Sequence, residues 1–167
     1  TGANGFIGSK LVEKLISSDN YVSVLVKKPI SCANNKISVF EGDILNTKTL
    51  FGPMKDCDVL FHCAAYISFQ KKDFRKAYDI NVLGTGNVLE AAYRAHIKKV
   101  VHLSACAVLG YSDKDDTLID ESANPMIGKD NVYAYTKKLA EEEVINYIGR
   151  GLDISIANIA TVYGQGD

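Results

Sequence analysis

The chain has 167 residues, of which 47% are hydrophobic and 23% charged, and this balance is typical of one soluble globular domain. A formal net charge of −1 gives no sign of the basic surface that binds nucleic acid, and no apolar run reaches the roughly 18 residues that cross a bilayer. The four cysteines, Cys32, Cys57, Cys63 and Cys106, contain no C-x-x-C pair, so we expect neither a metal site nor a disulfide framework. Cys63 and Cys106 lie in apolar surroundings, which predicts reduced core residues in a cytoplasmic protein.

Strands and helices are predicted to alternate along the chain. A glycine-rich loop occupies residues 1–8, and the apolar residues after it recur at helical spacing as far as Ile16. The run at 58–64 is almost continuously apolar, so we expect a strand that is buried on both faces. The polar, turn-rich residues 111–131, among them 113–116, predict a surface loop. The remaining elements are expected as strands at 21–26, 36–40, 99–104 and 153–159, and as helices at 47–54, 74–95 and 133–148.

This alternation predicts an α/β fold built on a doubly wound parallel sheet with right-handed crossovers. The first residue already lies in the loop that should follow a first strand, and such a strand is normally central in the sheet. The last residues, YGQGD, look like the start of a loop rather than the end of a fold. We therefore expect residues 1–167 to form one domain of a longer protein, without its first strand.

Three glycines, Gly2, Gly5 and Gly8, are spaced as in loops that bind a dinucleotide. A tight turn needs the positive φ that glycine adopts freely, and close approach of the backbone to a pyrophosphate leaves no room for a Cβ atom. The third glycine lets the following helix pack tightly on the sheet, and that helix directs its free N–H groups at the phosphates. Because a helix and then a strand follow the loop, we predict a nicotinamide dinucleotide site in a Rossmann fold.

The strand predicted at 21–26 ends on a basic pair rather than on an acid. A carboxylate at this point would accept hydrogen bonds from the ribose 2′-OH and would favour NAD. The chain has Lys27 and Lys28 here, and a lysine can pair with a 2′-phosphate, so we expect NADP, with NAD as the alternative. The simpler interpretation is that both lysines are solvated charges at the end of a strand.

Tyr133 and Lys137 are four residues apart and therefore share one face of the helix predicted at 133–148. Tyrosine is a poor acid or base at its usual pKa near 10, and a nearby ammonium group is expected to lower that pKa. The pair could then pass a proton to or from a substrate oxygen while a hydride moves. Tyr135 lies two residues further on and is expected to face elsewhere.

Together these motifs resemble the extended short-chain dehydrogenase/reductase family, within the NAD-dependent epimerase/dehydratase superfamily, over essentially all 167 residues. The resemblance implies an NAD(P)-binding Rossmann domain, which in the family is followed by a smaller C-terminal substrate domain. It gives Tyr133 the role of proton donor and Lys137 that of binding the ribose. The matching segments are TGANGFIG at 1–8, EGDI at 41–44, HCAA at 62–65, NVLGT at 81–85, NVYAYTKKLAE at 131–141 and TVYGQGD at 161–167.

The residues predicted to bind the cofactor, Lys27 among them, are spread over the whole length of the chain. In the family, the acid of the EGDI segment and the residue after it contact adenine, and the HCAA segment lies along the cofactor. Simpler interpretations remain: Asp43 as a turn residue, Asn81 as a residue that serves helix geometry, and His62 as a core histidine, which we favour over a catalyst. The predicted cofactor-binding residues are Gly2, Asn4, Gly5, Phe6, Ile7, Gly8, Lys27, Asp43, Ile44, Cys63, Ala64, Ala65, Asn81, Tyr133, Lys137 and Ile159.

Two positions depart from the family pattern. A second hydroxyl residue usually ends the fifth strand and orients the substrate carbonyl, but the alignment puts Ala105 there. Ser104 is our third catalytic candidate, although in a continuous strand it faces the other way. A twist at the strand end could bring Ser104 into place, or Cys106 or a residue of the substrate domain could serve instead. Asn158 and Ile159 stand where many members have Arg-Pro beside the nicotinamide, which could alter how the ring is held.

The leading hypothesis is an NADP-dependent oxidoreductase that transfers a hydride to or from a carbonyl or secondary alcohol, as in the dihydroflavonol-reductase branch. The alternatives are an NAD-dependent sugar-nucleotide epimerase and a non-catalytic NAD(P)-sensing protein. A dehydratase is disfavoured because Cys106 and Ala107 occupy the place of its acid pair. We expect a small-molecule substrate, no nucleic-acid or membrane partner, and a possible homodimer through the helices at 74–95 and 133–148.

Overall fold

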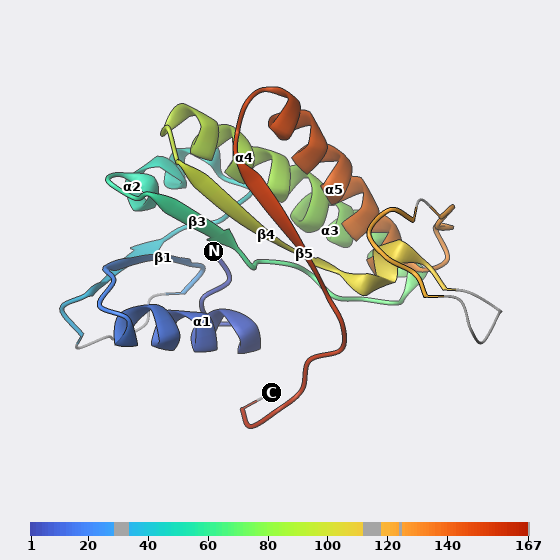
Figure 1. The fold of residues 1–167 in the computed structure, drawn as a ribbon, viewed down its shortest axis with the longest axis horizontal. Coiled ribbons are helices and arrows are strands. Elements are labelled where there is room, and N and C mark those ends of the chain that lie inside the picture. The colour runs from blue at the N-terminus through green and yellow to red at the C-terminus, as the bar shows by residue number, and fades with distance from the viewer. Residues whose placement is uncertain (29–33, 112–117, 124, 167) are drawn as a thin grey trace.

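Two parallel sheets form the centre of the structure, a computed structural model that describes residues 1–28, 34–111, 118–123 and 125–166 (Figure 1). In the first sheet β1 pairs with β2, and in the second β4 lies between β3 and β5. Every strand pair is parallel, which confirms the predicted α/β fold. Residues 113–116 of the predicted loop lie outside the described residues. The strands are β1 (Val22–Val26), β2 (Ile37–Glu41), β3 (Val59–His62), β4 (Lys99–Ala105) and β5 (Ile154–Ile159).

A cavity of about 640 Å³ is lined by residues of both sheets, among them residues of β1 and β3, and by residues of α1. Side chains alternate along β3: Leu60 and His62 are buried, whereas Val59 is 44% exposed and Phe61 only partly buried. The expectation that the run at 58–64 is buried on both faces is therefore wrong. The cavity leaves one side of β3 incompletely covered, which the apolar character of the run could not reveal.

The helices form where the sequence predicts them. Residues 74–94 are one continuous helix, in which a π-helical turn at Asp79–Leu83 connects α3 to α4. The helix predicted at 47–54 is divided into a 3₁₀ turn, Thr47–Thr49, and the short α2. The α-helices are α1 (Phe6–Ser17), α2 (Phe51–Met54), α3 (Phe74–Tyr78), α4 (Gly84–Arg94) and α5 (Val132–Gly149).

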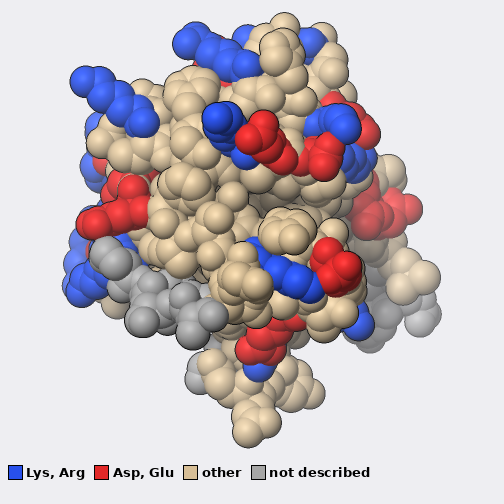
Figure 2. Space-filling model, turned by 90° about the vertical axis from the view of Figure 1, so that its left-hand side faces the viewer, with Lys and Arg blue, Asp and Glu red and all other residues tan. Residues whose placement is uncertain are grey.

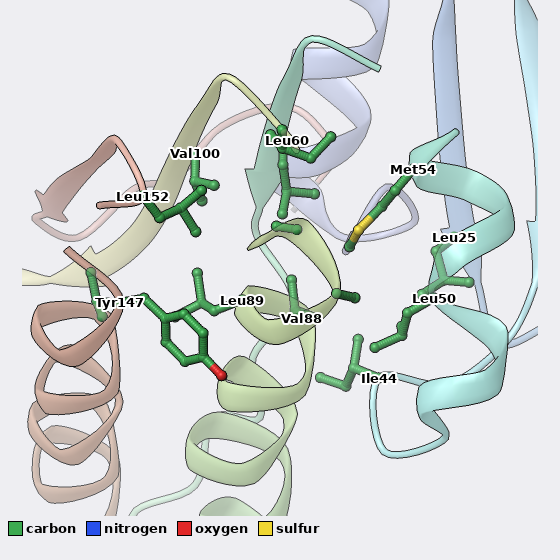
Figure 3. Packing of buried hydrophobic residues seen from close by; sticks show 14 residues of the cluster. Leu25, Ile44, Leu50, Met54, Leu60, Val88, Leu89, Val100, Tyr147 and Leu152 are labelled. Carbon is green, nitrogen blue, oxygen red and sulfur yellow. The ribbon is translucent and has the colours of Figure 1, made fainter. Parts of the chain in front are cut away.

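The main core lies between the β3–β4–β5 sheet and the α4–α5 pair, which Figure 1 shows side by side on one face of that sheet. Val88 and Leu89 of α4 and Val100 of β4 are fully buried and meet in this layer (Figure 3). Tyr147 of α5 packs against them, and its hydroxyl group donates a hydrogen bond to Glu90 at 2.9 Å. This packing fixes α5 on the sheet and so positions the residues at its opposite end.

Charged side chains of both signs are interspersed on the face that Figure 2 shows. This distribution agrees with a formal net charge near zero. Within the described residues, no helix combines the length and the apolar character needed to cross a membrane. The described parts of the chain also hold no cluster of three or more His, Cys, Asp or Glu side chains that could bind a metal ion.

Candidate active site

Two glycines of the loop leave no room for a Cβ atom, and the middle one leaves little. A Cβ atom on Gly2, which has φ of +78°, would lie 2.6 Å from the backbone nitrogen of Ala64. A Cβ atom on Gly8 would lie 2.1 Å from the carbonyl oxygen of Gly2, so α1 can begin this close to the loop only with glycine there. Gly5 precedes the first residue of α1, and a Cβ atom on it would lie 3.3 Å from the carbonyl oxygen of Gly2. The loop thus presents bare backbone and a helix N-terminus on one side, which fits a bound pyrophosphate.

A pocket of about 510 Å³ lies beside this loop, at the carboxyl ends of β3, β4 and β5 and the start of α5. Parallel strands bring their carboxyl ends to one edge of a sheet, so residues from both ends of the chain meet here. Among the predicted site residues, the pocket is lined by Gly2, Gly5, Phe6, Ile7, Gly8, Cys63, Ala65, Ser104, Tyr133, Lys137 and Ile159. The predicted residues outside its lining are Asn4, Lys27, Asp43, Ile44, Ala64 and Asn81.

Tyr133 and Lys137 both reach this pocket from the first turns of α5, whose start is capped by Asn131. Lys137 is only 2% exposed, and its amine donates a hydrogen bond to the carbonyl oxygen of Leu103 at 2.6 Å. Burial lowers the pKa of Lys137 to about 8, although the charge of Glu141 acts in the opposite direction.

The pKa of Tyr133 lies above its ordinary value, chiefly because the phenol is partly buried and secondarily through an electrostatic effect of the nearby Cys106 side chain. The expectation that Lys137 lowers this pKa is therefore wrong for the structure as described. Burial of the phenol outweighs any influence of the ammonium group, which is directed at Leu103. Tyr135 faces elsewhere, as predicted: its ring lies 6.1 Å from that of Phe74, and it does not line the pocket.

β4 stays regular to its end, where Ser104 pairs with Asn158 and Ala105 with Ile159 in the register with β5. Ser104 and Ala105 therefore point to opposite faces, and the strand shows no twist that would exchange them. Ser104 is 1% exposed, and its hydroxyl oxygen has no hydrogen-bond partner among the described residues. Ser104 is therefore part of the pocket lining, but almost none of its surface is exposed there.

The cysteines differ from the sequence-based expectation in one respect. Cys57, Cys63 and Cys106 are free thiols, and Cys32 lies outside the described residues. Cys63 is partly buried, and burial raises the pKa of its thiol. Cys106 is exposed in the pocket, so its assignment to the core is wrong. It directly follows β4, where the chain turns out of the sheet, and the apolar residues around it in sequence do not cover it.

Two predicted residues have structural contacts beneath the pocket. Asn81, in the π-helical turn, accepts a hydrogen bond from the backbone N–H of Tyr66 at 2.7 Å and donates one to the Thr136 hydroxyl at 3.0 Å. His62 lies 3.0 Å from the Thr85 hydroxyl oxygen through its Nε2 atom, and burial holds its pKa well below the usual range. Both observations favour the simpler interpretations, a residue that fixes helix geometry and a neutral core histidine.

Lys27 and Asp43 meet at the carboxyl ends of β1 and β2, where the Lys27 amine lies 2.8 Å from a carboxylate oxygen of Asp43. Asp43 also accepts a hydrogen bond from the backbone N–H of Leu45 at 3.0 Å, as a turn residue does. Burial opposes ionisation, but these two partners outweigh it, and the pKa of Asp43 lies below its ordinary value. Lys27 and Asp43, both predicted to bind the cofactor, thus form an ion pair with each other. The Lys27 side chain is 60% exposed.

The sequence missed several residues of the pocket wall. Ile67 and Phe69 lie in the segment after β3 and are 63% and 69% exposed, and the Phe69 ring lies 6.1 Å from that of Tyr133, edge to face. Thr161 and Val162, which follow β5, complete the wall. The segment after β3 has no helical or strand periodicity, so its apolar residues carried no signal that could place them.

The sequence profile of the NAD dependent epimerase/dehydratase family matches residues 1–167. A 4-hydroxy-2-methyl-3-oxo-4-farnesyl-3,4-dihydroquinoline-1-oxide ketoreductase from Stigmatella aurantiaca is 34% identical over 177 residues, which cover 100% of this chain and 50% of that protein. Cinnamoyl-CoA reductase 1 from Petunia hybrida is 30% identical over 182 residues, which cover 98% of this chain and 54% of that protein.

Solved structures agree with the sequence relatives. UDP-glucuronic acid 4-epimerase from Bacillus cereus, in complex with NAD, superimposes with a TM-score of 0.79 at 29% identity, over 98% of this chain and 55% of that one. The chain spans about half the length of the curated relatives that it matches. Reductases and epimerases therefore both occur among the proteins of this fold that it resembles.

Proposed function

This chain belongs to the NAD-dependent epimerase/dehydratase family, and we propose that it is the cofactor-binding part of an NADP-dependent oxidoreductase acting on a carbonyl or secondary alcohol. The observation that carries the proposal is the shared pocket of the glycine loop and the Tyr133–Lys137 pair. A nicotinamide bound there would supply or accept the hydride. A proton must move with that hydride, and Tyr133 has the hydroxyl group to deliver it.

In the direction of reduction, Tyr133 donates its proton to the substrate oxygen that becomes the alcohol. The phenol carries its proton at neutral pH, as a donor must, but because its pKa lies above the ordinary value it releases that proton less readily than an unperturbed tyrosine. Lys137 lies one helical turn away, and we assign its ammonium group to binding the ribose of the cofactor. The backbone of Gly5 and the first N–H groups of α1 hold the pyrophosphate, which needs no side chain.

Apolar pocket walls favour a reductase over a sugar-nucleotide epimerase. Next to Tyr133 the pocket is lined by Ile67, Phe69, Ala107 and Val162, and no acidic side chain lines it among the described residues. A sugar ring would leave its hydroxyl groups unpaired against such a surface, at a cost of about 1–3 kcal/mol for each unsatisfied group. An apolar carbonyl compound incurs no such cost. The absence of an acid from the lining also disfavours a dehydratase.

NADP is the proposed cofactor because Lys27 offers an exposed ammonium group at the end of β1, where a dinucleotide on the glycine loop would place its adenosine ribose. A 2′-phosphate would draw this group from Asp43, since a charge near −2 attracts it more strongly than one carboxylate. The second candidate is the NAD-dependent epimerase. It is favoured by the Lys27–Asp43 ion pair, which already neutralises the lysine, and by a structural neighbour bound to NAD.

For the whole protein we propose a small-molecule substrate and a homodimer formed through the α3–α4 and α5 helices. Ile145 and Ile148 of α5 are 59% and 44% exposed, and so offer apolar area to a second copy. Sedimentation of the full-length protein would report the dimer, and a monomer at micromolar concentration would contradict it.

The test of the proposed reaction is Tyr133→Phe in the full-length protein, with Tyr135→Phe as the matched control outside the pocket. NADPH oxidation is followed with a panel of apolar ketones and aldehydes, and cofactor binding by calorimetry. We expect Tyr133→Phe to lower turnover by about 10²–10⁴ and to leave the NADPH affinity within about twofold, because only the proton donor is lost. Unchanged turnover would refute the role of this helix, and cofactor binding without any turnover in the wild type would favour the NAD(P)-sensing alternative.

A further inference from the structure

Asn158, one of the two departures from the family pattern, binds a side chain of α5. Its amide group on β5 donates a hydrogen bond to a carboxylate oxygen of Glu141 at 2.6 Å. Both side chains are partly buried. Glu141 lies four residues after Lys137 and therefore on the same face of the helix. The strand thus holds an acidic side chain one helical turn from the buried lysine of the candidate site.

The surroundings of Lys137 make this carboxylate its principal counter-charge. Three titratable side chains act on Lys137 from the sheet. They are His62 of β3, Cys63, which follows β3, and His102 of β4. All three are neutral at pH 7: burial holds the pKa of His62 well below the usual range, lowers that of His102 to about 3 and raises that of Cys63.

The remaining groups around Lys137 are also uncharged. From the helix packed beside α5, the neutral Asn81 amide binds Thr136, the residue before Lys137. The Lys137 amine itself donates to the Leu103 carbonyl, a dipole without net charge. Tyr133, one turn earlier on α5, is a neutral phenol. Of the groups that act on Lys137, Glu141 is therefore the one with a full negative charge.

We propose that Asn158 and Glu141 are positioning residues, which together keep a proton on the Lys137 amine. Asn158 fixes the direction of the carboxylate, and the carboxylate offsets the loss of hydration that an ammonium group suffers when it is buried. Without that charge, burial alone would favour the neutral amine. The use of this proton, a hydrogen bond from the ammonium group to the ribose of the cofactor, rests on the proposed function, whereas the electrostatic coupling itself does not.

The coupling is measured in the full-length protein by NMR titration of lysine labelled with ¹³C at Cε, with the Lys137 signal identified by its loss in Lys137→Arg. We expect a wild-type midpoint near pH 8. In Glu141→Gln, which keeps the size and the hydrogen-bonding capacity of the side chain, the midpoint should fall by about one pH unit. Asn158→Ala should lower it in the same direction by less, and Glu141→Asp should restore part of the loss.

Glu142→Gln is the matched control, because Glu142 is the next residue of α5 and is exposed. An unchanged midpoint in a folded Glu141→Gln protein would overturn the proposal, as would an equal fall in Glu142→Gln. The pH profile of kcat supplies a second readout: its alkaline limb should move to lower pH in Glu141→Gln, whereas a merely structural loss would reduce kcat at every pH. If the NMR midpoint shifts but no turnover exists, the positioning role stands and the proposed function fails.

Discussion

Alanine substitutions in the glycine loop should separate stability from cofactor affinity. In Gly8→Ala the new Cβ atom would overlap backbone atoms at 2.1, 2.8 and 3.1 Å, none of which belongs to a flexible side chain. The start of α1 must then move away from the loop by about 1 Å, and such overpacking typically costs about 1–3 kcal/mol. In Gly5→Ala the nearest atom to the new Cβ is the carbonyl oxygen of Gly2 at 3.3 Å, a tight contact that a small shift relieves. We therefore expect the free energy of unfolding to fall by at most about 1 kcal/mol, mainly because alanine is a poorer N-cap for α1.

The order of the losses in cofactor affinity should differ, because Gly5 and Gly8 both line the pocket but the Cβ position of Gly8 is directed at the backbone of Gly2 and Ala3. A methyl group on Gly5 would stand between the backbone and a pyrophosphate, and we expect NADPH and NADH to bind at least about tenfold more weakly, equivalent to about 1.4 kcal/mol. The assays are calorimetric titration and thermal unfolding of the full-length protein. Gly149→Ala is the control, since nothing lies within 4 Å of its Cβ position. Wild-type affinity in Gly5→Ala would refute the assignment of this loop to a dinucleotide.

Two further predictions concern the ribose and the core. Lys27→Asp should weaken NADPH binding at least about tenfold and affect NADH binding little, because it places a carboxylate where the 2′-phosphate would bind. Equal losses of affinity for the two cofactors in calorimetric titrations would show that Lys27 does not contact that phosphate. Leu89→Ala should lower the free energy of unfolding by about 2–5 kcal/mol, because Leu89 is 0% exposed at the centre of the core. Leu118→Ala, at a position that is 98% exposed, should cost about 0.5 kcal/mol or less in the same denaturant series, and a similar loss in both variants would contradict the described packing.

Periodicity predicted the elements because each depends on local sequence. The helix at 74–94 follows from apolar residues repeated at helical spacing, and the strands on either side of it follow from short runs of apolar residues. The exposure of Val59 could not be predicted in this way, because it depends on what lies beside β3. Parallel topology then accounts for the site: once the strands are known to be parallel, the segments after β3, β4 and β5 must lie at one edge.

Electrostatic details of the site depend on contacts between distant residues, so the sequence could not supply them. Lys27 and Asp43 meet because β1 and β2 pair with Val26 opposite Glu41, a register that no local pattern specifies. The pKa of Tyr133 depends on its burial, and the Lys137 amine is directed at the Leu103 carbonyl; the i, i+4 spacing gives neither. Such spacing establishes that two side chains can interact, whereas the packing around them determines which partner each one binds.

The end of β4 has no exposed hydroxyl group in the place where the family pattern has its second one. Since the strand continues regularly to Ala105, a local twist does not bring Ser104 into the usual place of the second hydroxyl. Ser104 stays almost fully covered, and Cys106, the next exposed side chain, carries a thiol, which is a weaker hydrogen-bond donor. A missing donor of this kind costs about 10²–10³ in rate. If the proposed reductase activity is efficient, the second donor must therefore come from outside β4, because among the described residues the pocket wall beside Tyr133 is mostly apolar.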